Sequence, residues 1–372
     1  MDIRFMKRAL SAARRFEGRT SPNPAVGAVV VKDGVVIAEG LHEGPGMPHA
    51  EVKALVSCVV PVRGADLYVT LEPCSHHGRT PPCTDALISS GVSRVFIGMR
   101  DPNPDVSGCG GDLLRDAGVE VVMGVMGDEI ERFYEAYTKF VTRKLPFVTL
   151  KAAVTLDGKI ATSTGDSQWI SSETSRRFTH RLRARSDAVL VGIGTVKKDD
   201  PLLTVRMVRG RDPQRVVIDP DLEMPPTSRM FSQGKGKVII AAARDADPKR
   251  AERLRDRGAE IATVLRREDG LIGIEELLTE LGRRDVMRLL VEGGANTFTY
   301  FIKRAIFDKI VLVYAPKILT GADGLGLTVG EGPERIADAV LLGGMTVRRL
   351  GDDFVVEAYP DRRKGEEAKP TG

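Results

Sequence analysis

The strongest constraint on how this chain folds comes from three short segments that carry potential metal ligands. His49-Ala50-Glu51 begins one predicted helix, Pro73-Cys74 begins a second segment, and that segment closes at Cys83. Zinc prefers tetrahedral nitrogen and sulfur ligands, and a catalytic zinc site uses three protein ligands and leaves the fourth position open. One histidine and two cysteines supply such a set. The fold is therefore expected to bring His49, Cys74 and Cys83 together around one Zn²⁺ per chain.

The acidic residue beside the first ligand favours a catalytic zinc site. Glu51 lies two residues from His49, where its carboxylate can take a proton from a water molecule and return it to a leaving amine without ligating the metal. This pattern is typical of zinc deaminases, although eight residues separate the two cysteines here instead of two. The alternative is a structural zinc knuckle with His76 or His77 as the fourth ligand, but such a knuckle gives no reason for Glu51.

The other two cysteines are not expected to bind metal. Cys58 lies in an apolar helical run and is predicted to pack in the core, and Cys109 is predicted to be a loop residue, near the site at most. Four cysteines in a chain of 372 residues do not make a disulfide scaffold. Neither a signal-peptide pattern nor a membrane-spanning apolar run is present, so we expect a cytoplasmic location and no membrane partner.

Strand and helix signals alternate along the chain and predict two α/β domains. Pro146 blocks continuation of the helix before it, which places the domain boundary there. We predict a first domain at 1–146, a second at 147–360 and a disordered charged tail at 361–372. In the first domain, strands are predicted at 26–32, 35–39, 66–70, 94–99 and 119–123, and helices at 1–15, 50–59, 84–90, 112–116 and 129–144.

The second domain carries weaker local signals. Strands are predicted at 147–155, 187–191, 215–218, 237–241, 260–264, 288–291 and 309–314, and helices at 172–184, 248–257, 274–282 and 297–302. Gly192-Ile193-Gly194 follows a strand but lacks the third glycine and the acidic residue of a Rossmann fingerprint. Glu292-Gly293-Gly294 lies between a strand and a helix, where backbone N–H groups can hold a phosphate, although a simple tight turn explains it equally well.

Composition separates the possible substrates. Only 5% of the residues are aromatic, and the net charge is +4, so an aromatic or basic nucleic-acid surface is not indicated. A small anionic molecule suits this composition better. Two alternatives stay open from the residues alone. One is a nucleic-acid or free-base zinc deaminase with an accessory nucleotide-binding domain, and the other is a non-catalytic zinc module whose second domain senses a nucleotide.

Longer motifs identify a family. The chain resembles the bifunctional deaminase–reductases of riboflavin biosynthesis over nearly its whole length, and the long insert between the two cysteines is part of that resemblance. The matching segments are Pro22-Asn23-Pro24, Thr70 to Cys83, Asp101-Pro102-Asn103-Pro104, Leu156-Asp157-Gly158, Ser167 to Ile170, Asp199 to Arg206 and Val291 to Gly294.

The resemblance implies a cytidine-deaminase-like three-layer α/β/α domain followed by a dihydrofolate-reductase-like α/β domain. It also implies two reactions in sequence: zinc-dependent hydrolytic deamination of 2,5-diamino-6-(5-phosphoribosylamino)pyrimidin-4-one, then NADPH-dependent reduction of the ribosyl side chain, giving 5-amino-6-(5-phosphoribitylamino)uracil. The expected partner is thus a small phosphoribosyl pyrimidine and not a nucleic acid, and we expect a homo-oligomer.

Site residues can be carried over motif by motif. In the deaminase domain the resemblance implies substrate contacts from Asn23, His42, His76, Arg79, Thr80, Asp101 and Asn103. In the reductase domain it implies cofactor contacts from Ala153, Trp169, Thr195, Asp199, Gly294, Ala295, Asn296, Thr297, Phe298, Thr299 and Tyr300. Substrate contacts there fall on Lys151, Ser167, Arg183, Leu203, Arg206 and Glu292. Of these, Arg183 and Arg206 suit a phosphate monoester, because a guanidinium can donate two parallel hydrogen bonds to it.

Overall fold

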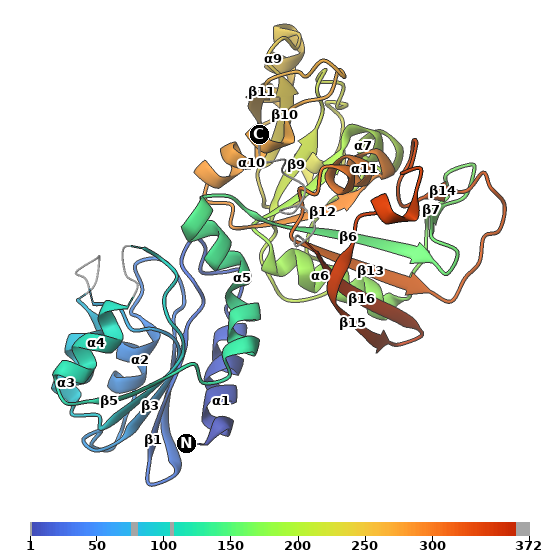
Figure 1. Cartoon of the computed structure of the whole chain (residues 1–372). Coiled ribbons are helices and arrows are strands. Elements are labelled where there is room, and N and C mark those ends of the chain that lie inside the picture. Colours follow the sequence, from blue (N-terminus) through green and yellow to red (C-terminus); the bar gives the residue numbers. More distant parts are fainter. Residues whose placement is uncertain (1, 76–80, 105–107, 362–372) are drawn as a thin grey trace, which may run out of the picture. The chain divides into compact units, whose positions relative to one another are not determined.

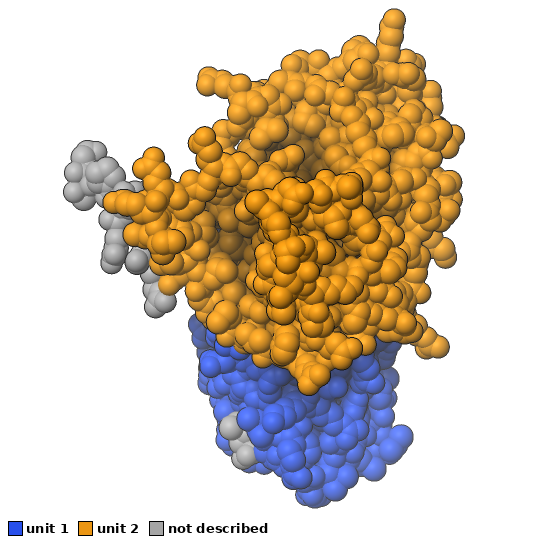
Figure 2. Space-filling view, turned by 90° about the vertical axis from the view of Figure 1, so that its right-hand side faces the viewer, with its two compact units in different colours: residues 1–146, 285–287 blue, residues 147–284, 288–372 orange. Residues whose placement is uncertain are grey.

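The computed structural model describes residues 2–75, 81–104 and 108–361, and the chain divides into two compact units (Figure 2). Unit 1 comprises Met1–Pro146 together with Asp285–Met287, and unit 2 comprises Phe147–Arg284 and Arg288–Gly372. All but the first residue of the tail predicted to be disordered at 361–372 lies outside the described residues.

Unit 1 is built on a five-stranded sheet in the order β2-β1-β3-β4-β5. Its strands are β1 (Gly27–Lys32), β2 (Val35–Leu41), β3 (Asp66–Leu71), β4 (Arg94–Met99) and β5 (Glu120–Met123). The first two form the predicted hairpin, in which Asp33 and Gly34 take positive φ angles of 51° and 76°. Such angles characterise the tight turn that Asp-Gly favours. Strands β3, β4 and β5 run parallel, so their carboxyl ends meet at one edge of the sheet.

Helices cover both faces of this sheet, giving three layers (Figure 1). Helices α1 (Ile3–Arg14) and α5 (Gly127–Arg143) lie on one face, and α2 (Ala50–Val56), α3 (Cys83–Ser90) and α4 (Cys109–Asp116) lie on the other. The expected three-layer α/β/α arrangement is therefore confirmed. Helices α2, α3 and α4 pack on a core of small and branched apolar side chains from the central strands, including Ala28, Val30, Leu67, Val69 and Ile97.

Two details of unit 1 differ from the predictions. Helix α2 ends at Val56, and Cys58 follows it, half-buried against the core as expected for a packing residue. Cys109 is exposed and is the first residue of α4, so its prediction as a loop residue is wrong. The glycines at 110 and 111 weaken the local helix signal. The close packing of the helix start against Pro73 explains one of them, because a Cβ on Gly110 would lie 2.0 Å from the Pro73 carbonyl oxygen.

Unit 2 contains a nine-stranded mixed sheet in the order β11-β10-β9-β8-β12-β6-β13-β16-β15. The first seven strands in this order are parallel and the last two pair antiparallel. An α/β fold is thus confirmed for this half as well. The bounds are β6 (Phe147–Thr155), β8 (Ala188–Gly192), β9 (Gln214–Ile218), β10 (Val238–Ala243), β11 (Ala259–Val264), β12 (Arg288–Gly293), β13 (Lys309–Ala315), β15 (Leu342–Leu350) and β16 (Asp353–Pro360).

The remaining elements of unit 2 include several that the sequence did not indicate. The predicted helices are α6 (Glu173–Arg185), α9 (Pro248–Asp256), α10 (Ile274–Arg283) and α11 (Ala295–Lys303). The unpredicted elements are α7 (Ile193–Asp199), α8 (Arg229–Ser232), a 3₁₀ turn (Ile336–Asp338), the small β7–β14 sheet (Lys159–Ala161, Leu325–Gly326) and the β15–β16 hairpin. Strand β15 is exposed along most of its length, so it lacks the alternation of a half-buried strand. Among the described residues, no helix has the length and apolar character needed to cross a membrane.

Candidate active sites

The three predicted zinc ligands meet at the layer of α2 and α3. His49 immediately precedes α2, Cys74 follows β3, and Cys83 begins α3. His49 Nδ1 lies 3.1 Å from Cys83 Sγ and 3.4 Å from Cys74 Sγ, and all three ligand atoms fall within 4.8 Å of one another. Ligands of a tetrahedral zinc ion are separated by about 3.5 Å from N to S, given the usual bond lengths. The donor set and its spacing therefore fit Zn²⁺ bound through Nδ1 and two sulfurs.

The electrostatics of the cysteine pair also suit a cation. A hydrogen bond from the Cys83 thiol lowers the pKa of Cys74 to about 4, and the Cys83 backbone N–H lies 3.4 Å from the same sulfur. Cys74 is therefore ready to act as a thiolate. A bound divalent cation would favour the thiolate of Cys83 as well, because metal ligation deprotonates a thiol.

Glu51 lies beside these ligands in the first turn of α2. It is 3% exposed, and burial raises the pKa of its carboxyl to about 7. A group with a pKa near neutrality can both accept and return a proton at physiological pH. The arrangement can thus bring together three metal ligands and a proton carrier, which is the chemistry that hydrolytic removal of an amine requires.

A cavity of about 640 Å³ opens next to Glu51 and Cys74. Four of the residues predicted to contact the deaminase substrate line it: Asn23, His42, Asp101 and Asn103. The other three, His76, Arg79 and Thr80, lie outside the described residues. The structure therefore gathers every described member of the predicted set around one cavity, and their contacts with a substrate stay a prediction.

Asn23 and His42 are joined by a hydrogen bond. The Asn23 amide Nδ2 lies 3.1 Å from His42 Nε2, and His42 Nδ1 lies 3.3 Å from the carbonyl oxygen of Pro48. His42 can satisfy both contacts by donating from Nδ1 and accepting at Nε2, which is its neutral form. Burial lowers the pKa of His42 and so favours that form.

Two residues that the sequence did not single out as site residues also line this cavity. Tyr137 of α5 donates a hydrogen bond to the carboxylate of Asp101, with oxygen separations of 3.1 and 3.4 Å. Glu72 follows β3 and is buried. Tyr137 falls on the apolar face of the predicted helix, where an aromatic residue indicates core packing. Nothing in the local sequence distinguishes it as a site residue.

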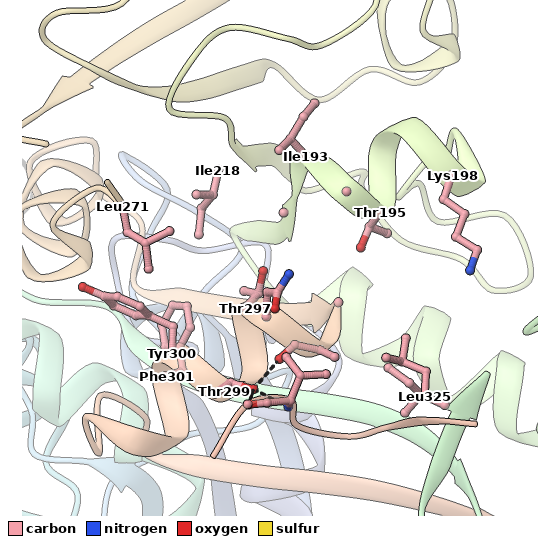
Figure 3. A pocket seen from close by; sticks show the side chains of 18 of the residues that line it. Ile193, Thr195, Lys198, Ile218, Leu271, Thr297, Thr299, Tyr300, Phe301 and Leu325 are labelled. Atoms are coloured by element: carbon pink, nitrogen blue, oxygen red, sulfur yellow. Dashed lines mark hydrogen bonds between the residues drawn. The ribbon is translucent and has the colours of Figure 1, made fainter. Parts of the chain in front are cut away.

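Unit 2 has a larger cavity, of about 1,090 Å³, that runs between two strand-to-helix turns (Figure 3). Helix α7 begins directly after β8, and α11 follows the neighbouring strand β12 with only Gly294 between them. The predicted residues that line this cavity are Ser167, Thr195, Asp199, Gly294, Ala295, Asn296, Thr297, Thr299 and Tyr300. Backbone N–H groups at a helix start favour phosphate groups, and the volume is of the size that a large cofactor needs.

Glycines let the two turns approach each other closely. A Cβ on Gly192 would lie 2.7 Å from Thr297 Oγ1, and a Cβ on Gly294 would lie 3.1 Å from Thr195 Oγ1. Each turn therefore places a glycine opposite the threonine of the other. A side chain at Gly192 would force the Thr297 side chain or the start of α11 to shift, since real Cβ atoms essentially never approach so closely.

Three predicted cofactor residues are not among those that line this cavity. Phe298 is 2% exposed and its side chain is in the core, Ala153 lies in β6, and Trp169 is 59% exposed with the Arg176 guanidinium 4.6 Å from its ring centroid. Their contacts with a cofactor stay predictions.

The predicted substrate residues of unit 2 form a buried charged group. Arg183 donates to both carboxylate oxygens of Glu292, at 2.6 and 2.8 Å, and to the carbonyl oxygen of Thr204 at 3.1 Å. Burial would raise the pKa of Glu292, but Arg183 lowers it below its usual value. Burial lowers the pKa of Lys151, and the nearby Glu292 opposes that effect. Glu292 thus stays ionised between two basic groups.

Leu203 and Arg206 lie on the segment that follows α7. Leu203 is 3% exposed, packs into the core and has a positive φ of 52°, a strained conformation for a branched residue. The Arg206 side chain is exposed, and its backbone N–H donates to His180 Nδ1 at 3.1 Å. His180 is a buried residue of α6 that no local sequence pattern distinguishes.

Comparisons with known proteins cover both halves of the chain. Residues 1–99 match the cytidine and deoxycytidylate deaminase zinc-binding region, and residues 146–356 match the RibD C-terminal domain. The chain is 44% identical to the riboflavin biosynthesis protein RibD of Aquifex aeolicus, covering 96% of this chain and 98% of the relative. It is 38% identical to RibD of Escherichia coli, covering 95% and 97%.

A solved structure shows the same two-part fold. The diaminohydroxyphosphoribosylaminopyrimidine deaminase/5-amino-6-(5-phosphoribosylamino)uracil reductase of Thermotoga maritima superposes with a TM-score of 0.84 at 40% identity, covering 96% of this chain and 98% of that one. RibD of Acinetobacter baumannii gives a TM-score of 0.85 at 33% identity, with the same coverage.

Proposed function

Because this chain belongs to the RibD family of riboflavin-biosynthesis enzymes, with both a deaminase and a reductase domain, we propose a division of labour between its two units. Unit 1, at 1–146, deaminates 2,5-diamino-6-(5-phosphoribosylamino)pyrimidin-4-one by hydrolysis. Unit 2, at 147–360, uses NADPH to reduce the ribosyl side chain of the product and releases 5-amino-6-(5-phosphoribitylamino)uracil. The substrate partner is thus a small phosphoribosyl pyrimidine.

One observation carries the deaminase assignment: a buried carboxyl group, that of Glu51, lies beside three ligands spaced for zinc. Bound Zn²⁺ supplies Lewis-acid activation of a water molecule. Glu51 takes a proton from the water as its oxygen bonds to the amine-bearing ring carbon, and then gives a proton to the departing nitrogen. Ammonia leaves, and the carbon retains the oxygen. His49, Cys74 and Cys83 would hold the ion.

For the cavity wall we propose a division between ring and phosphoribosyl contacts. Asn23, held against His42 by the 3.1 Å hydrogen bond, recognises the pyrimidine edge. Asp101 and Asn103, together with His42, His76, Arg79 and Thr80, contact the phosphoribosyl part. Rigid placement of Asn23 supports this assignment, because an amide can both donate to and accept from a ring edge.

In unit 2 we propose that NADPH occupies the large cavity, with its phosphates at the starts of α7 and α11. The lining residues Thr195, Asp199 and Gly294 to Thr297 support this placement. The cofactor supplies a hydride, and the protein orients the reacting carbon against it. Lys151 and Glu292 orient the ribose, and Arg183 and Arg206 bind the phosphate group, Arg206 with an exposed guanidinium.

The test is to incubate the full chain with the diaminopyrimidine substrate, with and without NADPH, and to identify the products by mass. Without NADPH we expect the deaminated ribosyl compound and free ammonia. With NADPH we expect the same compound carrying two further hydrogens, and oxidation of the cofactor. Absence of ammonia release would contradict the deaminase assignment, and absence of NADPH oxidation with the deaminated product would contradict the reductase assignment.

We further propose that the chain forms a homo-oligomer through strand β15 of unit 2. This strand is at the edge of the nine-stranded sheet and exposes Met345 by 66% and Val347 by 58%. Open apolar sheet edges are normally covered, and a second copy of the same strand can pair with it. Val347→Lys is expected to lower the molecular mass measured by analytical ultracentrifugation, whereas Val35→Lys on the unit 1 hairpin is expected to leave it unchanged. An unchanged mass for Val347→Lys would contradict this interface.

A further inference from the structure

A buried carboxylate that carries none of the proposed chemistry holds one wall of the deaminase cavity. Glu72 lies directly after β3 and two residues before Cys74, and it is 4% exposed. Its backbone N–H donates to the carbonyl oxygen of Met99, at the end of the neighbouring strand β4, at 3.0 Å. Its main chain is therefore fixed at the edge of the sheet where the carboxyl ends of β3 and β4 meet.

The Glu72 side chain accepts three hydrogen bonds from backbone N–H groups. Oε2 accepts from Asp101 and from Gly108, each at 3.1 Å, and Oε1 accepts from Gly111 at 2.9 Å. Bonds from backbone N–H groups to an ionised carboxylate are stronger than bonds between neutral groups. Both oxygens are thus occupied by donors from the main chain, which suits a residue that organises a loop and not one that transfers protons.

The start of helix α4 is packed against this carboxylate. Gly108 precedes the helix, and Gly111 lies in its first turn. A Cβ on Gly110 would meet the Pro73 carbonyl oxygen at 2.0 Å, so the helix start touches the main chain between Glu72 and Cys74. A negative charge near the first turn of a helix is favourable because unpaired N–H groups point toward it. Glu72 therefore joins the end of β3 to α4 and to Asp101, the second residue after β4.

The residue held in this way is Asp101, which lines the cavity. Its backbone N–H is bound by Glu72, while its carboxylate accepts from the Tyr137 hydroxyl at 3.1 Å and from the Asn103 backbone N–H at 2.9 Å. Asp101 is thus fixed through its main chain from β3 and through its side chain from α5. The hydrogen bond from the Asn103 backbone N–H to the Asp101 carboxylate also fixes the main chain of Asn103.

We propose that Glu72 is a positioning residue for the deaminase reaction, one that sets Asp101 and Asn103 at the cavity wall without touching the substrate's reacting atoms. The inference rests on the proposed deaminase function of unit 1. It assigns a role in substrate binding to the carboxylate that accepts from three backbone N–H groups, separate from the zinc ligands and from Glu51.

The variant Glu72→Gln tests this role with little change in shape. A glutamine has one acceptor oxygen, so its NH₂ group faces an N–H donor on one side whichever way the amide turns. Loss of one such bond to a charged group corresponds to about a 10- to 100-fold effect. We expect KM for the diaminopyrimidine to rise by about that factor, with kcat changing much less. Zinc content is expected to stay near one per chain.

Two controls separate positioning from general damage. The reductase activity of unit 2, measured on the same sample with the deaminated product, is expected to stay unchanged. Glu39→Gln replaces a carboxylate of unit 1 that pairs with Arg8 and Arg15 at the surface, and it is expected to leave deaminase KM unchanged. Parallel loss of zinc, or an equal fall in kcat and kcat/KM, would overturn the proposal.

A double-mutant cycle with Asp101→Asn tests whether Glu72 acts through Asp101. If it does, Glu72→Gln raises KM much less in the Asp101→Asn background than in the wild-type chain, because the two residues share one function. Fully additive effects would overturn the proposal. Wild-type deamination distinguishes the two levels: its absence contradicts the proposed function, whereas normal deamination with an unaffected Glu72→Gln variant contradicts only this inference.

Discussion

The metal site of unit 1 gathers His49, Cys74 and Cys83 within 4.8 Å of one another, whereas the large cavity of unit 2 is bounded mainly by two strand-to-helix turns. In the first site the functional atoms belong to side chains whose types are dictated by zinc chemistry. In the second, the central features are backbone N–H groups and glycines that allow the α7 and α11 starts to approach each other.

This difference decides how visible each site is in a sequence. Metal ligation and proton transfer require particular residue types at particular spacings, so they leave a pattern that local reading can find. Phosphate binding by helix starts requires only that the backbone is placed correctly, and many sequences achieve it. The two sites therefore predict different responses to loss of metal, because only the deaminase site depends on the ion.

Removal of zinc is expected to have the largest effect. Treatment with a strong chelator should reduce deaminase activity below detection, because the three ligands then have no ion to activate water. Reductase activity with the deaminated product should stay within about twofold, since an open catalytic zinc site adds less to folding than a zinc finger does. Ammonia release and NADPH oxidation, assayed on one sample before and after adding Zn²⁺ back, measure both. Loss of both activities together would show that the units depend on the same ion.

Glu51→Gln is expected to lower deaminase kcat by about 10²- to 10⁴-fold, the usual contribution of a proton carrier. The buried amide keeps the size of the side chain but cannot accept the proton. Zinc measured by atomic absorption should stay at about one ion per chain, and NADPH oxidation with the deaminated product should be unchanged. Survival of deamination in this variant would show that Glu51 is not the proton carrier.

Much of unit 1 was predictable because metal ligation and proton transfer require particular residue types at particular spacings. The ligands, Glu51 and the order of strands and helices follow from residue type and periodicity. Glu72 and Tyr137 were not found as site residues, because their roles depend on contacts between β3, β4, α4 and α5 that are remote in sequence. The beginning of α4 was missed because Gly110 and Gly111 have poor helix propensity, and the close packing of Gly110 against Pro73 is not visible in the local sequence.

Unit 2 was less predictable at its site than in its fold. The buried parallel strands were visible as apolar runs, whereas α7 was not, because Gly194 and Thr195 are weak helix formers. The reciprocal packing of Gly192 on Thr297 and of Gly294 on Thr195 joins turns that are about a hundred residues apart in the chain. The edge strand β15 carries no alternating pattern because it is exposed along most of its length.

Arg206→Ala tests the reductase site and is expected to have a smaller effect than the two changes in unit 1. If the exposed guanidinium binds the substrate phosphate, its removal should lower kcat/KM for the deaminated product by about 10- to 100-fold, the range for a hydrogen bond to a charged group. KM for NADPH and the deaminase rate should not change. Arg209→Ala removes a neighbouring exposed arginine and is expected to leave kcat/KM within about twofold. Equal effects of the two variants would contradict a specific phosphate contact at Arg206.

The smallest predicted effect concerns the stability of unit 2 in mild acid. Burial lowers the pKa of His180 to about 4, and the neutral ring accepts the Arg206 backbone N–H at Nδ1. In the unfolded chain a histidine titrates near a pKa of about 6.5. Between these two values the unfolded state binds the extra proton, so the stability that His180 gives above pH about 6.5 is lost as pH falls toward 4.

At pH 5 this loss is expected to be about 1 kcal/mol after allowance for partial solvent screening. His180→Gln keeps an acceptor for the Arg206 N–H and does not titrate, so its free energy of unfolding should fall less between pH 7 and pH 5 than that of the wild-type chain. Urea unfolding followed by circular dichroism at the two pH values measures the difference. If both chains lose the same free energy, His180 is already protonated in the folded state at pH 5, and the neutral acceptor that holds Arg206 in place is not present there.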